Sequence, residues 1–223
     1  MSCYICGGEK HSVEHAPAKC FFPKEKRINL TTVNSCEEHN EATSTDDEYV
    51  RNIIAMSISN NDVAENHFLK QCMKSFLRSP ALLKATTEKN KRVYYQNDQD
   101  GKKEIKPTYA FGIDRNRIDL VMRKIAYAIY FKQYGHRWNR ELHTGTEHLR
   151  TEGMFADDMG LLIQSTKRLM IDFPFAGTNP EVFKYAFLPT ESEDDNDQIM
   201  LMKFYEGFEM WIFPVNGSNG PIL

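Results

Sequence analysis

The sequence lacks any apolar run long enough to cross a membrane, since no stretch of about 18 consecutive apolar residues occurs in its 223 positions. The first residues also lack the apolar segment of a secretory signal. Cysteine is sparse, and three of the five cysteines stand at metal-ligand spacings. That usage indicates a reduced protein rather than a disulfide-bonded one. We therefore expect a cytoplasmic chain with no membrane partner.

A strong net charge is absent as well. The 28 basic and 31 acidic residues leave a net charge of -3, which gives no global sign of a nucleic-acid-binding protein. The charges are unevenly spread, however: residues 70–106 and 115–150 are rich in lysine and arginine, and residues 191–197 are acidic. A basic surface for DNA and an acidic far side are compatible with this near-neutral total.

What the chain does have is a metal-binding pattern at its start. Cys3-x-x-Cys6 is followed thirty residues later by Cys36-x-x-His39. Two such pairs predict a tetrahedral zinc with four protein ligands and hence no open position, so this zinc is expected to be structural. Cys20 remains an alternative for Cys36 or His39, and Cys72 is expected to be a free thiol.

The residues between these ligands suit a second, harder metal. The carboxylate of Glu14 and the side-chain carbonyl of Asn40 are ligands that Mg²⁺ or Mn²⁺ accepts. A neutral imidazole at His15 could take a proton from water. Taken alone, the pair Glu14-His15 can be explained as a surface dipeptide. Asn40, however, directly follows the predicted zinc ligand His39, so a bound zinc would fix the position of Asn40. The zinc pattern therefore favours a reaction centre here.

The hydrophobic pattern predicts an α+β protein. In residues 1–50 we expect strand 12–15, strand 29–33 and a helix from Cys36. Residues 51–223 form a second, mixed α and β domain in this prediction, for substrate or partner recognition. The elements expected after residue 43 are helices from 44, over 63–84 and from 118 to 134, a hairpin around 97–101, and strands at 183–188 and within 199–213. Residues 160–172 fit a strand or a helix.

Together, Cys3-x-x-Cys6, Glu14-His15-x-Pro17, Asn29-Leu-x-Thr-Val33 and Cys36-x-x-His39-Asn40 resemble the HNH (His-Me finger, ββα-metal) endonucleases, in their zinc-stapled branch. The resemblance covers residues 3–49. It implies that His15 is the general base, that Glu14 and Asn40 bind a catalytic Mg²⁺ or Mn²⁺, and that Asn29 orients the imidazole.

Three residues depart from the family's usual pattern. His39 stands where cysteine is usual, and Glu14 where aspartate is usual. The interval between Asn29 and Cys36 is longer than in the shortest members, which keeps Asn34 as an alternative to Asn29.

The resemblance implies a divalent-metal-dependent endonuclease that hydrolyses phosphodiester bonds in DNA. By analogy it serves in bacterial defence against phage or mobile DNA, beside a partner ATPase or as a homo-oligomer. The alternatives are an RNA-cleaving toxin and a non-catalytic zinc-finger module that binds nucleic acid or protein. The basic and aromatic residues around Lys124, with Tyr127, Tyr130 and Trp138, fit either a DNA-binding face or the core.

Overall fold

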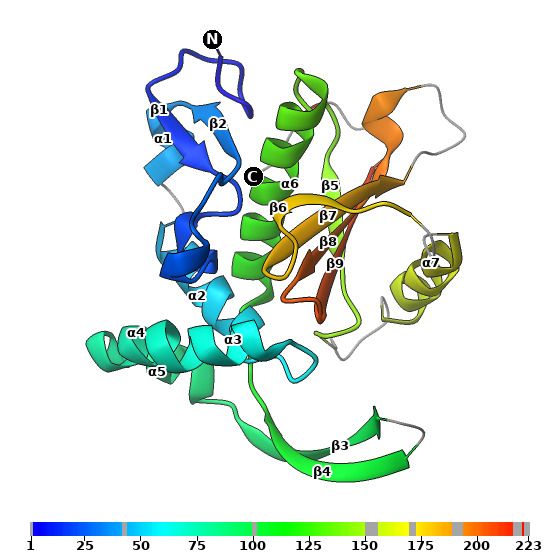
Figure 1. Cartoon of the computed structure of the whole chain (residues 1–223). Coiled ribbons are helices and arrows are strands. Elements are labelled where there is room, and N and C mark those ends of the chain that lie inside the picture. The colour runs from blue at the N-terminus through cyan, green and yellow to red at the C-terminus, as the bar shows by residue number, and fades with distance from the viewer. Residues whose placement is uncertain are drawn as a thin grey trace.

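The computed structural model describes residues 2–41, 44–99, 102–149, 156–169, 173–188, 194–215 and 220. Helices and strands occur largely in separate runs along the chain, and all the described strand pairs are antiparallel, as in an α+β protein (Figure 1). The predicted class is confirmed at this level.

The N-terminal segment has the order strand, strand, helix. Strand β1 (Ser12–His15) pairs antiparallel with β2 (Thr32–Ser35), and the short helix α1 (Glu37–Glu41) follows. Strand β1 has the predicted bounds, and β2 begins three residues later than predicted. Asn29 explains the shift, because its φ of 53° lies in the left-handed region and interrupts an extended strand.

A run of helices follows, broken by one proline. Its members are α2 (Ser44–Ala55), α3 (Asp62–His67), a π-helical turn (Phe68–Cys72), α4 (Met73–Arg78) and α5 (Pro80–Thr87). Ser79 accepts a hydrogen bond from the Leu82 amide, and Pro80 occupies the first turn, where its missing N–H costs nothing. The single helix predicted over 63–84 is thus divided, and Pro80 begins a new helix.

Helix α6 (Arg115–Tyr134) lies between the N-terminal segment and the large sheet (Figure 1). Asp114 caps its first turn, and Gly135 ends it at a φ of 77°. Both neighbours cover the helix, so Tyr127 and Tyr130 are buried, and Tyr130 stacks on Trp138 at 4.6 Å between ring centroids. These aromatic residues were expected to form either a DNA-binding face or part of the core, and the structure shows that they belong to the core.

The large sheet has five antiparallel strands in the order β5-β9-β8-β7-β6. The strands are β5 (Leu142–Gly145), β6 (Ala176–Asn179), β7 (Phe183–Leu188), β8 (Ile199–Phe204) and β9 (Phe208–Pro214). Helix α7 (Ala156–Leu169) shows that residues 160–169 are helical, whereas 170–172 lie outside the described residues. On β8, Met200 and Met202 belong to the cluster that contains α6, whereas Leu201 packs with Ile163 of α7. Because successive side chains of a strand point to opposite faces of the sheet, α6 packs on one face of the sheet and α7 on the other.

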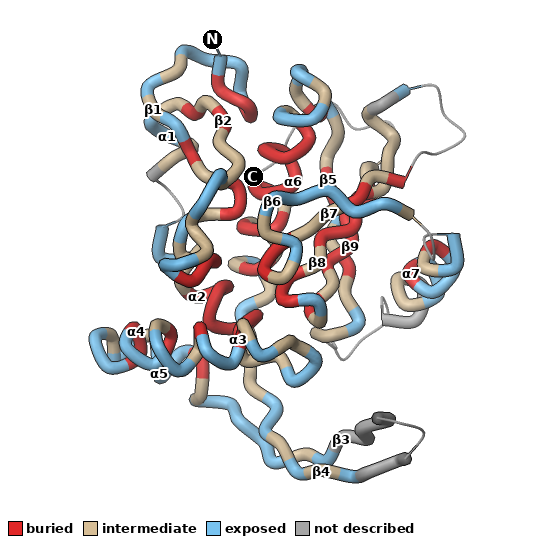
Figure 2. The backbone as a smooth tube through the Cα atoms, viewed as in Figure 1, coloured by how far each residue is buried: buried red, intermediate tan, exposed pale blue. Residues whose placement is uncertain are grey.

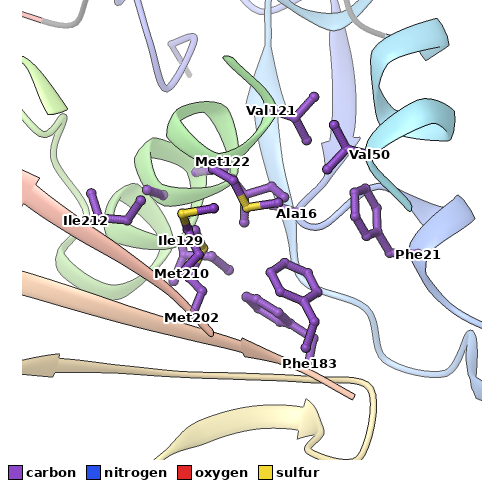
Figure 3. Close-up of a cluster of buried hydrophobic side chains, with 14 of the residues drawn as sticks. Ala16, Phe21, Val50, Val121, Met122, Ile129, Phe183, Met202, Met210 and Ile212 are labelled. Carbon is purple, nitrogen blue, oxygen red and sulfur yellow. The ribbon is translucent and has the colours of Figure 1, made fainter. Parts of the chain in front are cut away.

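One buried cluster joins the N-terminal segment to the rest of the chain. Ala16, Phe21 and Val50 gather beside Val121 and Met202, from α6 and the sheet (Figure 3). Figure 2 shows this buried region continuing along α6 into the sheet. A domain boundary at residue 50 stays a prediction, but the packing runs across it.

The hairpin of β3 (Lys91–Gln99) and β4 (Lys102–Ala110) extends away from this body (Figure 1). The predicted hairpin is confirmed, although residues 97–99 continue β3, and 100–101 lie outside the described residues. Among the helices that the structure describes, none is both long and apolar enough to cross a membrane.

Candidate metal centre and the residues around Glu14

The four predicted zinc ligands come together at the entrance to α1. The thiols of Cys3, Cys6 and Cys36 and one ring nitrogen of His39 all lie within 4.8 Å of one another. The chain turns back at Gly7, whose φ of 74° suits a residue without Cβ, and the Gly8 amide donates to Cys6 Sγ at 3.4 Å. The turn at Cys3–Gly8 thus places the thiols of Cys3 and Cys6 beside the first turn of α1.

The distances within this group fit a tetrahedral zinc. Zinc–sulfur bonds of about 2.3 Å place two sulfurs about 3.8 Å apart. Cys6 Sγ and Cys36 Sγ are separated by 3.8 Å, and Cys3 Sγ and His39 Nδ1 also by 3.8 Å. Cys36 Sγ and His39 Nδ1 are closer, at 2.9 Å, so one ligand would move outward around the ion. The group could hold a metal ion, and its donor set is that of structural zinc.

Cys20 does not belong to this group. Burial raises the pKa of its thiol to about 12, which keeps it neutral, whereas zinc binds the thiolate. Burial likewise raises the pKa of Cys72 to about 11. Both are free thiols in apolar surroundings, as expected for Cys72.

Glu14 is buried against α6, with a partner for each carboxylate oxygen. Lys124 forms an ion pair with Oε1, and the Tyr4 hydroxyl donates to Oε2 at 3.0 Å. Burial raises the pKa of Glu14, and Lys124 opposes that shift. Burial and the adjacent Glu14 carboxylate hold the pKa of Tyr4 well above its ordinary range. The lysine and the phenol therefore compensate much of the cost of burying this carboxylate.

His15 is more accessible than Glu14, because successive side chains of a strand point to opposite faces. Burial lowers the pKa of His15, and the positive charge of Lys19 adds to the shift. Both residues still reach one small hollow of about 10 Å³ at the end of β1, which is room for about one water molecule. Tyr4, Ala16, Ala18, Asp47, Lys124, Ile125 and Ala128 complete its lining.

The three asparagines of the prediction lie at different distances from this hollow. Asn40 follows His39 on α1, which contacts β1, but it does not line the hollow. Asn29 is not brought to His15: Thr32 is opposite His15, and the Asn29 carbonyl accepts a hydrogen bond from Thr178 of β6. Asn34 is opposite Val13 and accepts from the Tyr4 amide through its carbonyl at 3.0 Å. The structure thus groups Glu14 with His15, places Asn40 on the neighbouring helix, and leaves the other two apart.

Three residues of this hollow were missed from the sequence: Tyr4, Asp47 and Lys124. A signal existed for Lys124, which occurs in the same helical phase as the apolar Val121 and Ile125, and a lysine there is buried and needs an acidic partner. Asp47 lies within the acidic start of α2, where helix capping alone explained it. Nothing in the local pattern around Tyr4 indicates its contact with Glu14.

Two arginines in the first turn of α6 have structural partners. Arg117 pairs with Asp46 at 2.6 Å, and its guanidinium lies 4.2 Å from the ring centroid of Tyr49. Arg115 pairs with Asp119 and donates to the carbonyl of Thr144 at 2.9 Å. These contacts hold α2 and β5 to α6, so they serve the fold.

A larger pocket, of about 400 Å³, lies between α6, β5 and the side chain of Met159. It contains no residue of the predicted centre. Asp119, one of its two carboxylates, is already bound by Arg115 and Thr144. His143 reaches this pocket, but within the described ranges neither it nor His136 or His148 joins a group that could hold a metal.

Comparison of the chain with protein-family models, with curated proteins and with solved structures gave no match.

Proposed function

We propose that this chain is a divalent-metal-dependent endonuclease that hydrolyses phosphodiester bonds in DNA, with an HNH-type centre at the end of β1. The observation that carries the proposal is the group of Cys3, Cys6, Cys36 and His39. By joining the start of the chain to α1, a zinc ion there fixes the strand that bears Glu14 and His15 relative to the helix that bears Asn40.

The donor types around the hollow fit a hard divalent ion. Glu14 and Asp47 supply carboxylates from β1 and α2. Asn40 lies on α1 and does not line the hollow, so its side chain would have to turn toward the ion to supply a carbonyl oxygen. These residues would hold Mg²⁺ or Mn²⁺, which supplies charge stabilisation at the scissile phosphate when bound. The hollow is too small for a hydrated ion as it stands, so Lys124 or Tyr4 would have to give up part of its contact with Glu14.

In this proposal His15 takes the proton from the attacking water. Its lowered pKa is consistent with a neutral imidazole near neutral pH, the form that accepts a proton. Lys124 opposes the rise that burial causes in the pKa of Glu14, and it places a positive charge beside the reaction centre. Zinc takes no part in the chemistry, because its four protein ligands leave no open position.

The direct test is cleavage of supercoiled plasmid DNA in the presence of Mg²⁺ or Mn²⁺. His15→Ala is expected to lower the rate by about a hundredfold or more, since a general base contributes roughly that factor. Val13→Ala is the matched control, because Val13 lies on the same strand and is 48% exposed. The control is expected to cleave like the wild type, and zinc content is expected to be equal in all three proteins.

Equal nicking by the wild type and His15→Ala would contradict the assigned base. The same assay on branched DNA and structured RNA tests the substrate, and cleavage of RNA without cleavage of DNA would replace this proposal with that of a ribonuclease. Defence against phage or mobile DNA, beside an ATPase, is the biological setting that the resemblance implies and belongs to the same proposal.

A second candidate function has an observation in its favour. Both oxygens of Glu14 have protein partners, as expected of a structural carboxylate in a non-catalytic zinc-binding module. Under this alternative, zinc-loaded wild-type protein cleaves no nucleic acid with either ion, and Glu14→Gln lowers stability only.

A further inference from the structure

The β3–β4 hairpin packs little against the rest of the described chain. Its two strands contact each other extensively but extend away from the body (Figure 1). Tyr94, Ile105 and Tyr109 are 66%, 72% and 58% exposed. An isolated two-stranded ribbon is marginally stable in water, so apolar side chains on such a ribbon point to a binding partner.

The strand register sorts the hairpin's side chains into two faces. Arg92 is opposite Tyr109, and Tyr94 is opposite Pro107, so these four residues share one face. The guanidinium of Arg92 lies 5.9 Å from the Tyr94 ring centroid. Lys91 belongs to the other face. One face is thus aromatic with an arginine at its base, and positive charge is present on both.

The charge of this region decides between partner classes. Residues 70–106 hold ten of the 28 basic residues and four of the 31 acidic ones. The remainder of the chain, with 18 basic and 27 acidic residues, is net acidic, although it includes the basic-rich residues 115–150. We define the hairpin root as Lys89, Lys91 and Arg92, all three of which are exposed. A net positive segment on a protein whose total charge is negative matches a polyanion.

The shape fits duplex DNA. Each strand has nine residues, so the ribbon spans about 30 Å at about 3.3 Å per residue. That length is close to one helical turn of the duplex, about 34 Å. A two-stranded ribbon fits a DNA groove, and exposed aromatic and proline side chains are the kind that pack against bases while lysines contact phosphates.

We infer that the β3–β4 hairpin is a DNA-binding arm, whose root residues contact backbone phosphates and whose Tyr94 face packs into a groove. The inference deepens the proposed function, because it gives the nuclease a second hold on duplex DNA apart from the hollow at Glu14. Binding by the arm is nevertheless measurable without cleavage.

The test measures affinity of the full-length protein for a labelled duplex by fluorescence anisotropy, over a range of salt concentrations and without added divalent metal. Lys91→Ala/Arg92→Ala is expected to weaken binding about tenfold and to reduce the slope of log K against log salt by about two, close to one per phosphate contact. Tyr94→Ala is expected to weaken binding without changing that slope. Lys132→Ala/Arg168→Ala, which removes the same two charges from exposed helix positions, is the matched control and is expected to leave both quantities unchanged.

Unchanged affinity and slope in Lys91→Ala/Arg92→Ala would overturn the inference, as would an equal loss in the control. If light scattering shows instead that Tyr94→Ala turns a dimer into a monomer with unchanged DNA affinity, the hairpin binds a second copy and the inference is wrong. A cleavage assay separates the two proposals. DNA binding that depends on the arm, without cleavage, would contradict the proposed nuclease activity. Cleavage together with DNA binding that does not depend on the arm would contradict the proposed DNA-binding arm.

Discussion

At the scale of single residues, buried charges define the region around the candidate centre. Glu14 and Lys124 lie in an interior position with relative exposures of 9% and 4%, where an unpaired charge of either sign is costly. Their pairing ties β1 to α6 and leaves His15, the next residue, at the accessible edge. The same contact that stabilises the strand therefore also sets the electrostatic surroundings of the proposed base.

His67 provides a residue-scale prediction away from the centre. It is 1% exposed, and burial, with the nearby charges of Arg51 and Arg27, lowers its pKa to about 4. The Tyr205 hydroxyl donates to the Phe21 carbonyl at 2.6 Å, so we infer that His67 donates to the Tyr205 oxygen through Nδ1, also at 2.6 Å. Nε2 then has no partner among the described residues.

Between pH 6.5 and 4 the unfolded chain takes up a proton at His67 that the native state refuses, so the free energy of unfolding is lost as the pH falls. The group's full effect, about 3 kcal/mol at about 1.4 kcal/mol per pKa unit, is reached below pH 4, and none of it is felt well above 6.5. Urea unfolding of the wild type and His67→Asn across this range measures the effect. Asparagine retains a donor near Nδ1 but does not titrate, so the variant is expected to be less stable at pH 7 and to lose less on acidification. Parallel pH profiles would contradict this account.

At the scale of elements, the turn between β8 and β9 shows how one glycine sets a close approach. A Cβ on Gly207 would lie 1.9 Å from the backbone oxygen of Ser59, in the loop between α2 and α3. Gly207→Ala is therefore expected to lower the free energy of unfolding by about 2 kcal/mol or more, because backbone must move.

Gly160→Ala is the control of opposite sign. Gly160 lies inside α7, and nothing is within 4 Å of its would-be Cβ. The helix propensity of alanine is expected to raise stability by about 0.5–1 kcal/mol. Denaturant titrations of both variants compare the two effects, and a Gly207→Ala protein as stable as the wild type would show that the Ser59 loop yields readily.

Elements with strong local signals could be predicted. Helix α6 has an aspartate cap, an apolar stripe and a terminal glycine, and β7, β8 and β9 are rich in apolar residues. The short strands β5 and β6 were missed because their polar residues become strands only by pairing with β9 and β7. The predicted start of β2 was three residues too early, because the sequence of β-branched residues after Asn29 does not reveal that the backbone of Asn29 is in the left-handed conformation.

The residues of the candidate centre likewise divide into those that the sequence could predict and those that it could not. The four candidate metal ligands could be predicted from spacing, since two ligands three residues apart in a turn lie close together. The Glu14–Lys124 contact joins residues 110 positions apart and depends on how α6 crosses β1, which no local pattern encodes. Asp47 reaches the hollow for the same tertiary reason.

At the scale of the whole molecule, the zinc group and the hydrophobic core are continuous. Cys3, Tyr4 and Ile5 belong to the same buried cluster as α6 and the inner face of the sheet. A zinc ion held by Cys3 and its partners would therefore restrain residues that pack against α6. Loss of zinc is expected to loosen the candidate centre and this part of the core together.

We propose that one metal holds the fold and that a different one serves in the chemistry. The most direct measurement follows zinc content and plasmid cleavage in the same sample, after a chelating resin has removed weakly bound ions. We expect one zinc to remain on each wild-type chain, no cleavage without a further ion, and cleavage restored by Mg²⁺ or Mn²⁺ but not in His15→Ala. Cleavage that needs no added ion, or zinc-loaded wild type that stays inactive with both ions, would contradict the claim.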